Sequence, residues 1–246
     1  MISFYRKYFF LRVRQNWFTC NCKLSDIFSL KAYVFVKNIE HEKIWGIKRI
    51  SYTIENSLVP DKDVIFSGFK SSTKYDIRRA EKEGIDCYFH EDIDAFVKFY
   101  NAFAKERKIP PTSRQRMIEM GENLKLSFAL FKGQVLSAHS YVVDKDIGVV
   151  RFYQSASLRF DSHFDPAKIG RSNKLLQYKD MLYFKKKGFK IFDFGGYTEN
   201  TRDKGLIGIN QYKLSFGGKI TTCYSCYSIG YYIIMRLAEL LELLRR

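Results

Sequence analysis

A glycine-rich segment near the end of the chain constrains the fold more than any other feature of the sequence. Residues 192–218 read FDFGGYTENTRDKGLIGINQYKLSFGG and contain six glycines. Gly195 and Gly196 directly follow an apolar run that is typical of a β-strand, so the backbone can leave that strand without a Cβ and approach a ligand closely. Tight turns alone would also account for these glycines. Asp193, at the end of the same run, is either a cap for the turn or a substrate contact.

Charge and composition restrict the partners of the chain. Its 246 residues include 42 Lys and Arg against 26 Asp and Glu, a net charge of +16. This balance predicts polyanionic partners, namely phosphate-rich cofactors, nucleotide-linked substrates, RNA or an anionic membrane surface, with a generally basic surface as the alternative. A hydrophobic content of 46% excludes a disordered chain, and 17% aromatic residues lead us to expect rings lining a cleft.

The first twenty residues mix basic side chains into the apolar ones, so we expect no signal peptide. No stretch has the length of a membrane span, so we expect no stable membrane insertion and a cytoplasmic location with reduced cysteines. Cys20, Cys22, Cys223 and Cys226 could in principle surround zinc, but the spacing of the first pair is poor. Free thiols and no metal are the prediction.

Apolar periodicity predicts alternating strands and helices. The expected strands are Ala32–Val36, Ile50–Ile54, Ile85–Phe89, Leu126–Lys132, Val135–Val143, Val149–Ala156, Lys190–Phe194 and Lys219–Tyr227. The expected helices are Lys74–Glu83 after an N-cap at Ser71–Thr73, Ile93–Lys108, Arg114–Asn123, Ser172–Lys187 and Tyr231–Leu244, with a loop over Leu158–Ile169. Together they predict an α/β (α+β) layer with antiparallel strands and one crossover, and a soft boundary near residue 124.

Three motifs in the second half resemble a known superfamily. The order SASL, IGRSNKLLQYKDMLYFKKKGFKIFDFGG and GINQYKLSFGGK is similar to the Gcn5-related N-acetyltransferases, and within them to the Fem-type branch and its relatives in cell-surface polysaccharide synthesis. The resemblance covers residues 126–226. It implies a mixed, mainly antiparallel sheet flanked by helices, with a smaller, degenerate acceptor-side half over residues 1–124 and the transferase half over residues 125–246.

The resemblance also implies a reaction. Fem-type enzymes attach amino acids from aminoacyl-tRNA to the peptidoglycan precursor, but they are longer than this chain. Its size is more similar to relatives that use an acyl-CoA to acylate the amino group of a nucleotide-linked sugar. We therefore expect direct attack of that amine on the thioester, without a metal. The alternatives are transfer from aminoacyl-tRNA and a non-catalytic basic module that binds RNA or anionic lipid.

A turn before the helix expected at Ser172 is the predicted cofactor site. In the superfamily, the corresponding turn offers backbone N–H groups to the pyrophosphate of CoA. Here Gly170 would permit the turn, Arg171 and Lys174 would add charge, and Ser172 and Asn173 would open the helix toward the anion. An ordinary helix cap with solvated basic neighbours is the alternative.

His139 is the candidate base, because the ordinary pKa of histidine lies near neutrality. Strand alternation places it on one face with Ser137 and Tyr141. A hydrogen-bonded core histidine is the alternative. The other histidines lie in charged, loop-like contexts and are weaker candidates: His41, His90 and His163.

Two further pairs complete the predicted site. In the superfamily, the helical turn that holds Tyr212 and Lys213 flanks the thioester; the tyrosine would protonate the leaving thiolate, and the lysine would stabilise the oxyanion or hold a phosphate. Tyr153 and Gln154 lie on the strand near the acyl group. Because neighbours on a strand point to opposite faces, only one of them, Tyr153 by preference, should contact substrate. The final amphipathic helix could pack on its own core or on a second copy, which allows a homodimer.

Overall fold

The computed structural model describes residues 2–8, 11–20, 23–37, 46–161 and 163–243. Contacts divide the chain into two compact units, one made of residues 1–53 and 221–246 and the other of residues 54–220. The predicted boundary near residue 124 therefore falls inside the second unit. The reason is that β5 (Asp86–Phe89) pairs antiparallel with β6 (Leu124–Phe131), which joins the chain on both sides of that position.

The first unit contains the strand order β1-β2-β3-β10. Its elements are β1 (Ile2–Tyr8), β2 (Leu11–Trp17), the short 3-10 helix η1 (Leu24–Asp26), β3 (Lys31–Val36), most of β4 (Ile47–Ser57) and of β10 (Lys219–Tyr227), and α7 (Ile229–Leu243). Neither β1 nor β2 was predicted, although Leu11 and Val13 of β2 alternate with Arg12 and Arg14. It predicted β10 with the observed bounds.

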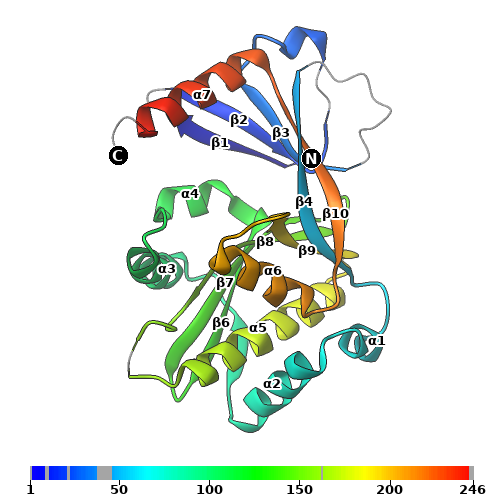
Figure 1. The fold of residues 1–246 in the computed structure, drawn as a ribbon, viewed down its shortest axis with the longest axis vertical. Coiled ribbons are helices and arrows are strands. Elements are labelled where there is room, and N and C mark those ends of the chain that lie inside the picture. Colours follow the sequence, from blue (N-terminus) through cyan, green and yellow to red (C-terminus); the bar gives the residue numbers. More distant parts are fainter. Residues whose placement is uncertain (1, 9–10, 21–22, 38–45, 162, 244–246) are drawn as a thin grey trace. The chain divides into compact units, whose positions relative to one another are not determined.

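The second unit contains the strand order β4-β9-β8-β7-β6-β5 (Figure 1). Its further elements are α1 (Lys62–Ser67), α2 (Ser71–Lys82), α3 (Ile93–Arg107), α4 (Arg114–Glu119), η2 (Gly121–Asn123), β7 (Gln134–Asp144), β8 (Val149–Ser157), α5 (Pro166–Lys186), β9 (Ile191–Tyr197) and α6 (Lys204–Leu214). This mixed and mainly antiparallel sheet with flanking helices confirms the predicted fold class.

The β6–β7 hairpin has the expected tight turn. Lys132 and Gly133 are its two loop residues, and both have positive φ angles, 49° and 80°. Two such residues form the turn whose twist matches paired strands. Antiparallel pairing continues from β7 to β8, and the crossover helix α5 then leads to β9, which pairs parallel with β8.

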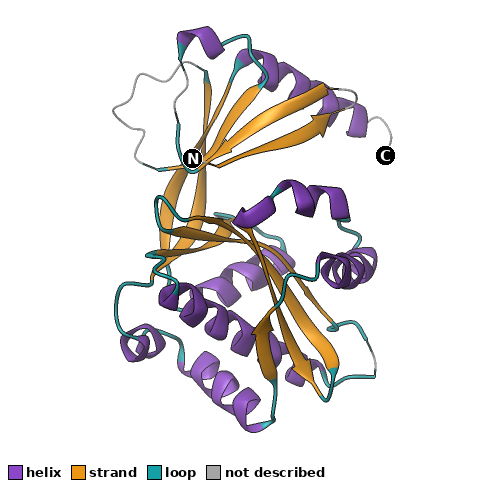
Figure 2. Ribbon diagram, turned by 180° about the vertical axis from the view of Figure 1, so that it is seen from behind, coloured by secondary structure: helices purple, strands orange, loops and turns teal. Residues whose placement is uncertain are grey.

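Helices cover both faces of the sheet in the second unit (Figure 2). On one face, α5 packs its buried Leu175, Leu176 and Phe184 into the main core, together with Leu136 of β7 and Phe192 of β9. On the other face, Phe96 of α3 meets Phe128 of β6 with ring centroids 6.4 Å apart. This packing fixes which strand residues face α5 and which face α3 and α4.

Helix α5 begins six residues earlier than predicted. Asp165 is its N-cap and accepts hydrogen bonds from the backbone N–H groups of Ala167 and Lys168, and Pro166 occupies the first turn. Aspartate followed by proline is a strong helix-start signal. The prediction of a loop through Ile169 is therefore wrong. Among the described residues, no helix is both long and apolar enough to cross a bilayer.

Candidate functional site

The strands β8 and β9 diverge in the middle of the sheet. Their parallel register pairs Val149 with Ile191, Val150 with Phe192 and Arg151 with Asp193, and no later residue of β9 is in that register. β8 continues beside β7 to Ser157, whereas β9 ends at Tyr197 and leads to α6. Parallel strands that separate in this way leave backbone groups at the carboxyl end available to a ligand.

A buried ion pair marks the point of divergence. The Arg151 guanidinium donates to Asp193, and both side chains are less than a tenth exposed. The other carboxylate oxygen of Asp193 accepts the Gly195 N–H at 2.7 Å, so Asp193 has the capping role that was one of its two predicted roles. Gly195 has a φ of +78°, and a Cβ there would lie 3.3 Å from the Phe152 carbonyl oxygen. The close approach of β9 to β8 therefore requires glycine at this position.

Lys213 of α6 reaches back to the same turn. Its Nζ donates to the carbonyl oxygen of Gly196 at 2.6 Å. Burial and, to a smaller extent, the Arg151 guanidinium lower the pKa of Lys213, the Asp193 carboxylate acts in the opposite direction, and the net result is a pKa of about 8. A lysine with a lowered pKa beside a strand opening is a candidate functional group. The structure thus brings Lys213 together with Asp193, Gly195 and Gly196, as the sequence predicted for one site.

A chain of polar side chains leads from α6 into the core. The Tyr212 hydroxyl accepts a hydrogen bond from Asn173 Nδ2 at 3.0 Å. The Oδ1 of the same asparagine lies 2.8 Å from His139 Nε2, and His139 Nδ1 lies 2.9 Å from Asp180 Oδ2. His139 and Asp180 are fully buried. Four side chains from β7, α5 and α6 therefore form one continuous path, Tyr212–Asn173–His139–Asp180.

Asp180 collects donors at the inner end of this path. The hydroxyls of Ser127 and Tyr141 also donate to its Oδ2, at 2.9 and 2.5 Å, whereas its buried Oδ1 has no hydrogen-bond partner among the residues that the structure describes. Burial, followed by the nearby Asp180 charge, raises the pKa of Tyr212 far above its ordinary value. Tyr212 therefore carries its phenolic proton at neutral pH and can act as a hydrogen-bond or proton donor.

His139 does not have the position expected of a base that touches substrate. As predicted, it shares a face with Ser137 and Tyr141, and the Tyr141 hydroxyl lies 3.1 Å from its Nδ1. Both of its ring nitrogens face protein groups, and the side chain has no solvent-exposed surface. This matches the alternative of a hydrogen-bonded core histidine, which acts on Tyr212 only through Asn173.

The five predicted cofactor residues, Gly170 to Lys174, lie inside α5 and not in a turn before it. Their backbone N–H groups belong to the interior of the helix, where they bond to carbonyl groups one turn earlier. Arg171 donates to Glu83 at 2.7 Å, and Lys174 pairs with Asp76 at 2.7 Å, so both cations hold α5 to α2. The predicted pyrophosphate-binding turn is therefore absent from these residues.

A bulge in β8 changes the expectation for Tyr153 and Gln154. The β7–β8 register pairs Ser140 with Gln154 and Tyr141 with Phe152, which leaves Tyr153 as the extra residue. The Tyr153 hydroxyl accepts a 2.7 Å hydrogen bond from Arg116 of α4. The Tyr100 hydroxyl of α3 interacts with Tyr153 and with Gln154. The rule that neighbouring residues face opposite sides is wrong here, because a bulge turns consecutive side chains to one face.

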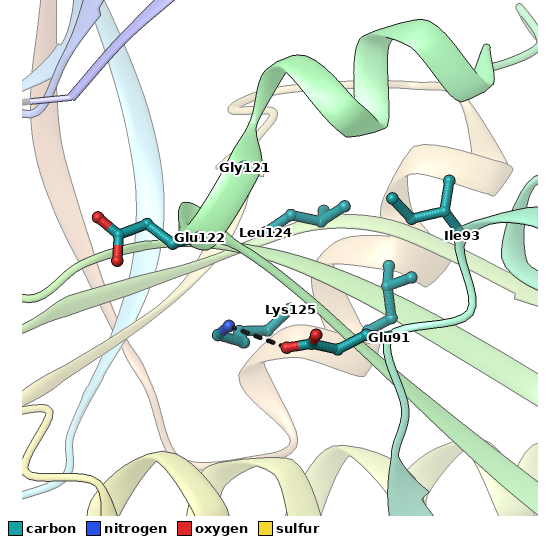
Figure 3. A pocket seen from close by; sticks show the side chains of 7 residues that line it. Glu91, Ile93, Gly121, Glu122, Leu124 and Lys125 are labelled. Atoms are coloured by element: carbon teal, nitrogen blue, oxygen red, sulfur yellow. Dashed lines mark ion pairs between the residues drawn. The ribbon is translucent and has the colours of Figure 1, made fainter.

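Two cavities lie elsewhere in the second unit. One, of about 290 Å³, is lined by residues of η2, β6 and the β5–α3 loop, where Lys125 pairs with Glu91 at 3.6 Å (Figure 3). The other, of about 280 Å³, lies between α3 and the end of β8, against Phe103 and Phe160. Neither cavity is lined by a predicted site residue. We therefore place the candidate site at the divergence of β8 and β9, where Lys213 lies.

Metal-binding residues were not expected. Among the described residues, no group of three or more His, Cys, Asp or Glu side chains is placed to hold an ion. Cys223 and Cys226 are buried thiols, Cys20 is partly buried, and Cys22 lies outside the described residues.

Arg151 and Asp180 were not among the site residues predicted from the sequence. The seven-residue spacing of Asn173 and Asp180 places them on one face of a helix, two turns apart, and this spacing could have revealed the pair. Arg151 carried a weaker signal, namely a charged residue inside an otherwise apolar strand.

Comparison with known proteins identifies a similar fold but no similar sequence. Neither a protein-family model nor a curated protein matches the sequence. The structure of FemX superposes with a TM-score of 0.60 at 11% identity, over 76% of this chain and 64% of that one. This chain has the fold of FemX. The match spans less than two thirds of the length of FemX, and it confirms the expected Fem-type likeness at the level of the fold.

Two lysylphosphatidylglycerol synthetase structures show the same fold. The C-terminal domain of a predicted synthetase from Agrobacterium fabrum gives a TM-score of 0.61 at 8% identity, over 98% of this chain and 84% of that chain. L-PGS from Bacillus licheniformis gives 0.55 at 11% identity, over 88% and 74%. Both matches extend over most of this chain, including parts of each unit.

Proposed function

We propose that this protein is an acyl-group transferase in which an amine attacks a carbonyl carbon held where β8 and β9 diverge. The observation that carries the proposal is Lys213, a partly buried amine with a pKa lowered to about 8, bonded to the Gly196 carbonyl at that divergence. The preceding residue on α6 is Tyr212, whose protonated phenol is hydrogen-bonded to Asn173 of the buried polar path. Acyl transfer to an amine needs both kinds of group, one for the oxyanion and one for the leaving group.

The reaction follows from these positions. The neutral amine forms a bond to the carbonyl carbon, and the electron pair of the carbonyl moves to its oxygen. The Lys213 ammonium stabilises that oxyanion, which is worth about 3 to 4 kcal/mol for a well-placed donor. When the bond to the leaving sulfur or oxygen breaks, Tyr212 gives it a proton. The attacking nitrogen gives its surplus proton back to the phenolate, so the enzyme is regenerated.

Asn173 and His139 act on this reaction through Tyr212. The amide of Asn173 holds the phenol, His139 holds the amide, and Asp180 holds the imidazole. A buried carboxylate with three donors costs desolvation energy that an apolar core would not need. Such a network is consistent with a positioning role, because it fixes the direction in which the phenol donates.

For the substrates, we propose an acyl-CoA donor and the amino group of a nucleotide-linked sugar in the cytoplasm, a step in surface polysaccharide synthesis. The Fem-type sequence resemblance and the net charge of +16 support anionic substrates of this kind. In this proposal Lys213 supplies positive charge and Tyr212 a proton at the carbonyl, which suits direct amine attack on an activated acyl group.

An aminoacyl-tRNA donor is the second candidate, and one observation favours it. The resemblance assigned a CoA pyrophosphate to a helix start at Gly170–Lys174, but α5 starts at Pro166, and Asp165 occupies the backbone N–H groups of Ala167 and Lys168 there. A carboxylate at this helix start repels a second anion. The structure of FemX, which is named as a Fem-type protein, also superposes on 76% of this chain.

Donor-specific turnover tests the proposal. The full chain is incubated with acetyl-CoA and a panel of nucleotide-linked amino sugars while free thiol is measured. In parallel, it is incubated with total aminoacyl-tRNA, with and without ribonuclease, while release of the labelled amino acid is measured. Turnover in one arm that Lys213→Met abolishes supports the proposal and identifies the donor.

The matched control is Lys204→Met, which removes an exposed lysine from the first turn of the same helix. It should keep wild-type turnover. If neither donor is consumed and wild type behaves as Lys213→Met does, while RNA binds and salt steeply weakens that binding, the chain is a non-catalytic basic module and the proposal is wrong.

A further inference from the structure

A row of aliphatic side chains on α7 faces solvent. Five of them are between 38% and 53% exposed: Ile229, Ile233, Leu237, Leu240 and Leu241. Their spacing of three or four residues puts them on one side of the helix. We call these five residues the α7 stripe. Scattered exposed aliphatic residues are normal, but a continuous row on one helix marks an interaction surface.

The stripe is not needed to hold α7 in place. The opposite side of the helix carries Tyr231, which is 2% exposed and whose hydroxyl accepts a 2.9 Å hydrogen bond from Gln15 of β2. Ser228, directly before the helix, accepts the backbone N–H of Tyr231 at 3.2 Å. α7 therefore packs on its sheet with one face and presents a second apolar face outward.

The unit that carries α7 also has the higher net positive charge per residue. Residues 1–53 and 221–246 make up about a third of the chain but contain thirteen Lys and Arg against five Asp and Glu. This is a net charge of +8, half of the total of +16. Near the stripe, Arg236 is exposed on α7 and pairs with Glu239 of the same helix at 2.7 Å, and the Arg49 guanidinium stacks on the Tyr232 ring at 5.4 Å.

We propose that the α7 stripe docks on the surface of an anionic lipid bilayer, with the helix lying in the plane of the headgroups. An apolar helix face inserts to the boundary of the acyl chains, and basic residues around it are attracted by anionic lipids, each by about 1 kcal/mol. A second copy of the chain is disfavoured as the occupant. Two units of net charge +8 would repel each other, whereas an anionic surface attracts them.

This docking is distinct from the transferase site, because every residue of the stripe lies outside residues 54–220. It would place the protein where the lipid-linked or membrane-proximal steps of envelope synthesis occur. The inference stands or falls independently of the proposed reaction, since it concerns binding and not turnover.

Co-sedimentation with vesicles tests the proposal. The full chain is mixed at 100 mM NaCl with vesicles of equal parts phosphatidylglycerol and phosphatidylcholine, or of phosphatidylcholine alone. We expect binding to the anionic vesicles, a strong decrease at 500 mM NaCl, and little binding to the neutral ones. The double variant Leu237→Ser with Leu240→Ser should lower the partition coefficient by about tenfold or more, from the apolar area that no longer inserts.

Two controls make the result decisive. Val59→Ser with Ile147→Ser removes two exposed aliphatic side chains from the other unit and should leave vesicle binding unchanged. Circular dichroism and thermal unfolding should show that both double variants are folded. Absence of binding to anionic vesicles, or binding that the stripe variant does not weaken, overturns the proposal. So does a dimer in light scattering that becomes a monomer in the stripe variant, because a second copy would then cover the stripe.

Discussion

Replacing Lys213 by methionine should stabilise the protein while removing its activity. The pKa of this lysine falls from 10.5 to about 8 on folding, mainly because burial disfavours the ammonium. That difference corresponds to about 3 kcal/mol. Partial exposure of the side chain and its bond to the Gly196 carbonyl reduce this value, so we expect the free energy of unfolding at pH 7 to rise by about 1 to 2 kcal/mol.

The gain should depend on pH in a defined direction. Between pH 8 and 10.5 the unfolded chain binds more protons at Lys213 than the folded chain, so the stability of the wild type rises with pH through this window. Below pH 8 both states are protonated and the full penalty is present; above 10.5 neither is. The stability difference between Lys213→Met and wild type should therefore be largest at pH 7 and nearly vanish above pH 10.5.

Activity should change in the opposite sense. Loss of an oxyanion-stabilising donor lowers kcat/KM by about 100- to 1000-fold. The assays are urea unfolding at pH 7 and at pH 10.5, and turnover with the donor identified above. Lys204→Met, exposed on the same helix, should change unfolding by less than about 0.5 kcal/mol. If Lys213→Met destabilises the protein at pH 7, or retains turnover, Lys213 is a structural ion and the assignment of the site is refuted.

Three further predictions concern the fold and the buried path. Gly217→Ala should destabilise by about 3 kcal/mol or more in urea unfolding, because φ is +75° and its Cβ would lie 2.4 Å from a backbone carbonyl oxygen. Gly133→Ala, with φ of +80° in open space, should cost only about 1 kcal/mol, and equal effects would contradict the packing. Arg151→Met should cost about 3 to 5 kcal/mol because it leaves a buried carboxylate without its cation; a change below 1 kcal/mol would show that the pair is dispensable. Asp180→Asn should lower the pKa of Tyr212, since the carboxylate charge helps to raise it; a ring-carbon NMR titration that shows no change would break the link between them.

Local patterns in the sequence predicted much of the second unit. The β6–β7 hairpin follows from two apolar runs around Lys132 and Gly133, and α3 follows from its i, i+3, i+4 rings. Two predictions were wrong for different reasons. The start of α5 was placed at Ser172, although Asp165 and Pro166 carry a stronger helix-start signal. The alternation expected of Tyr153 and Gln154 is broken by a bulge in the pairing of β8 with β7. A bulge depends on the register of the partner strand, which a single strand's sequence does not specify.

The sequence predicted several residues of the candidate site but not how they contact one another. Tyr212, Lys213 and the glycine turn lie together because they are close in sequence. The contact of His139 with Asn173 depends on how α5 crosses β7, and it joins residues 34 positions apart. No periodicity in the sequence specifies that crossing. His139 was therefore predicted to be a base, whereas in the structure it is buried between Asn173 and Asp180.

The boundaries within β4 and β10 have a consequence for synthesis of the chain. Residues 54–220 are continuous, whereas the other unit is assembled from the first 53 and the last 26 residues. During synthesis, β3 is made early but can pair with β10 only after the last part of the chain has been made. A chain that is cut after residue 220 would therefore lack the partner of β3, although β1, β2 and β3 could still pair with one another.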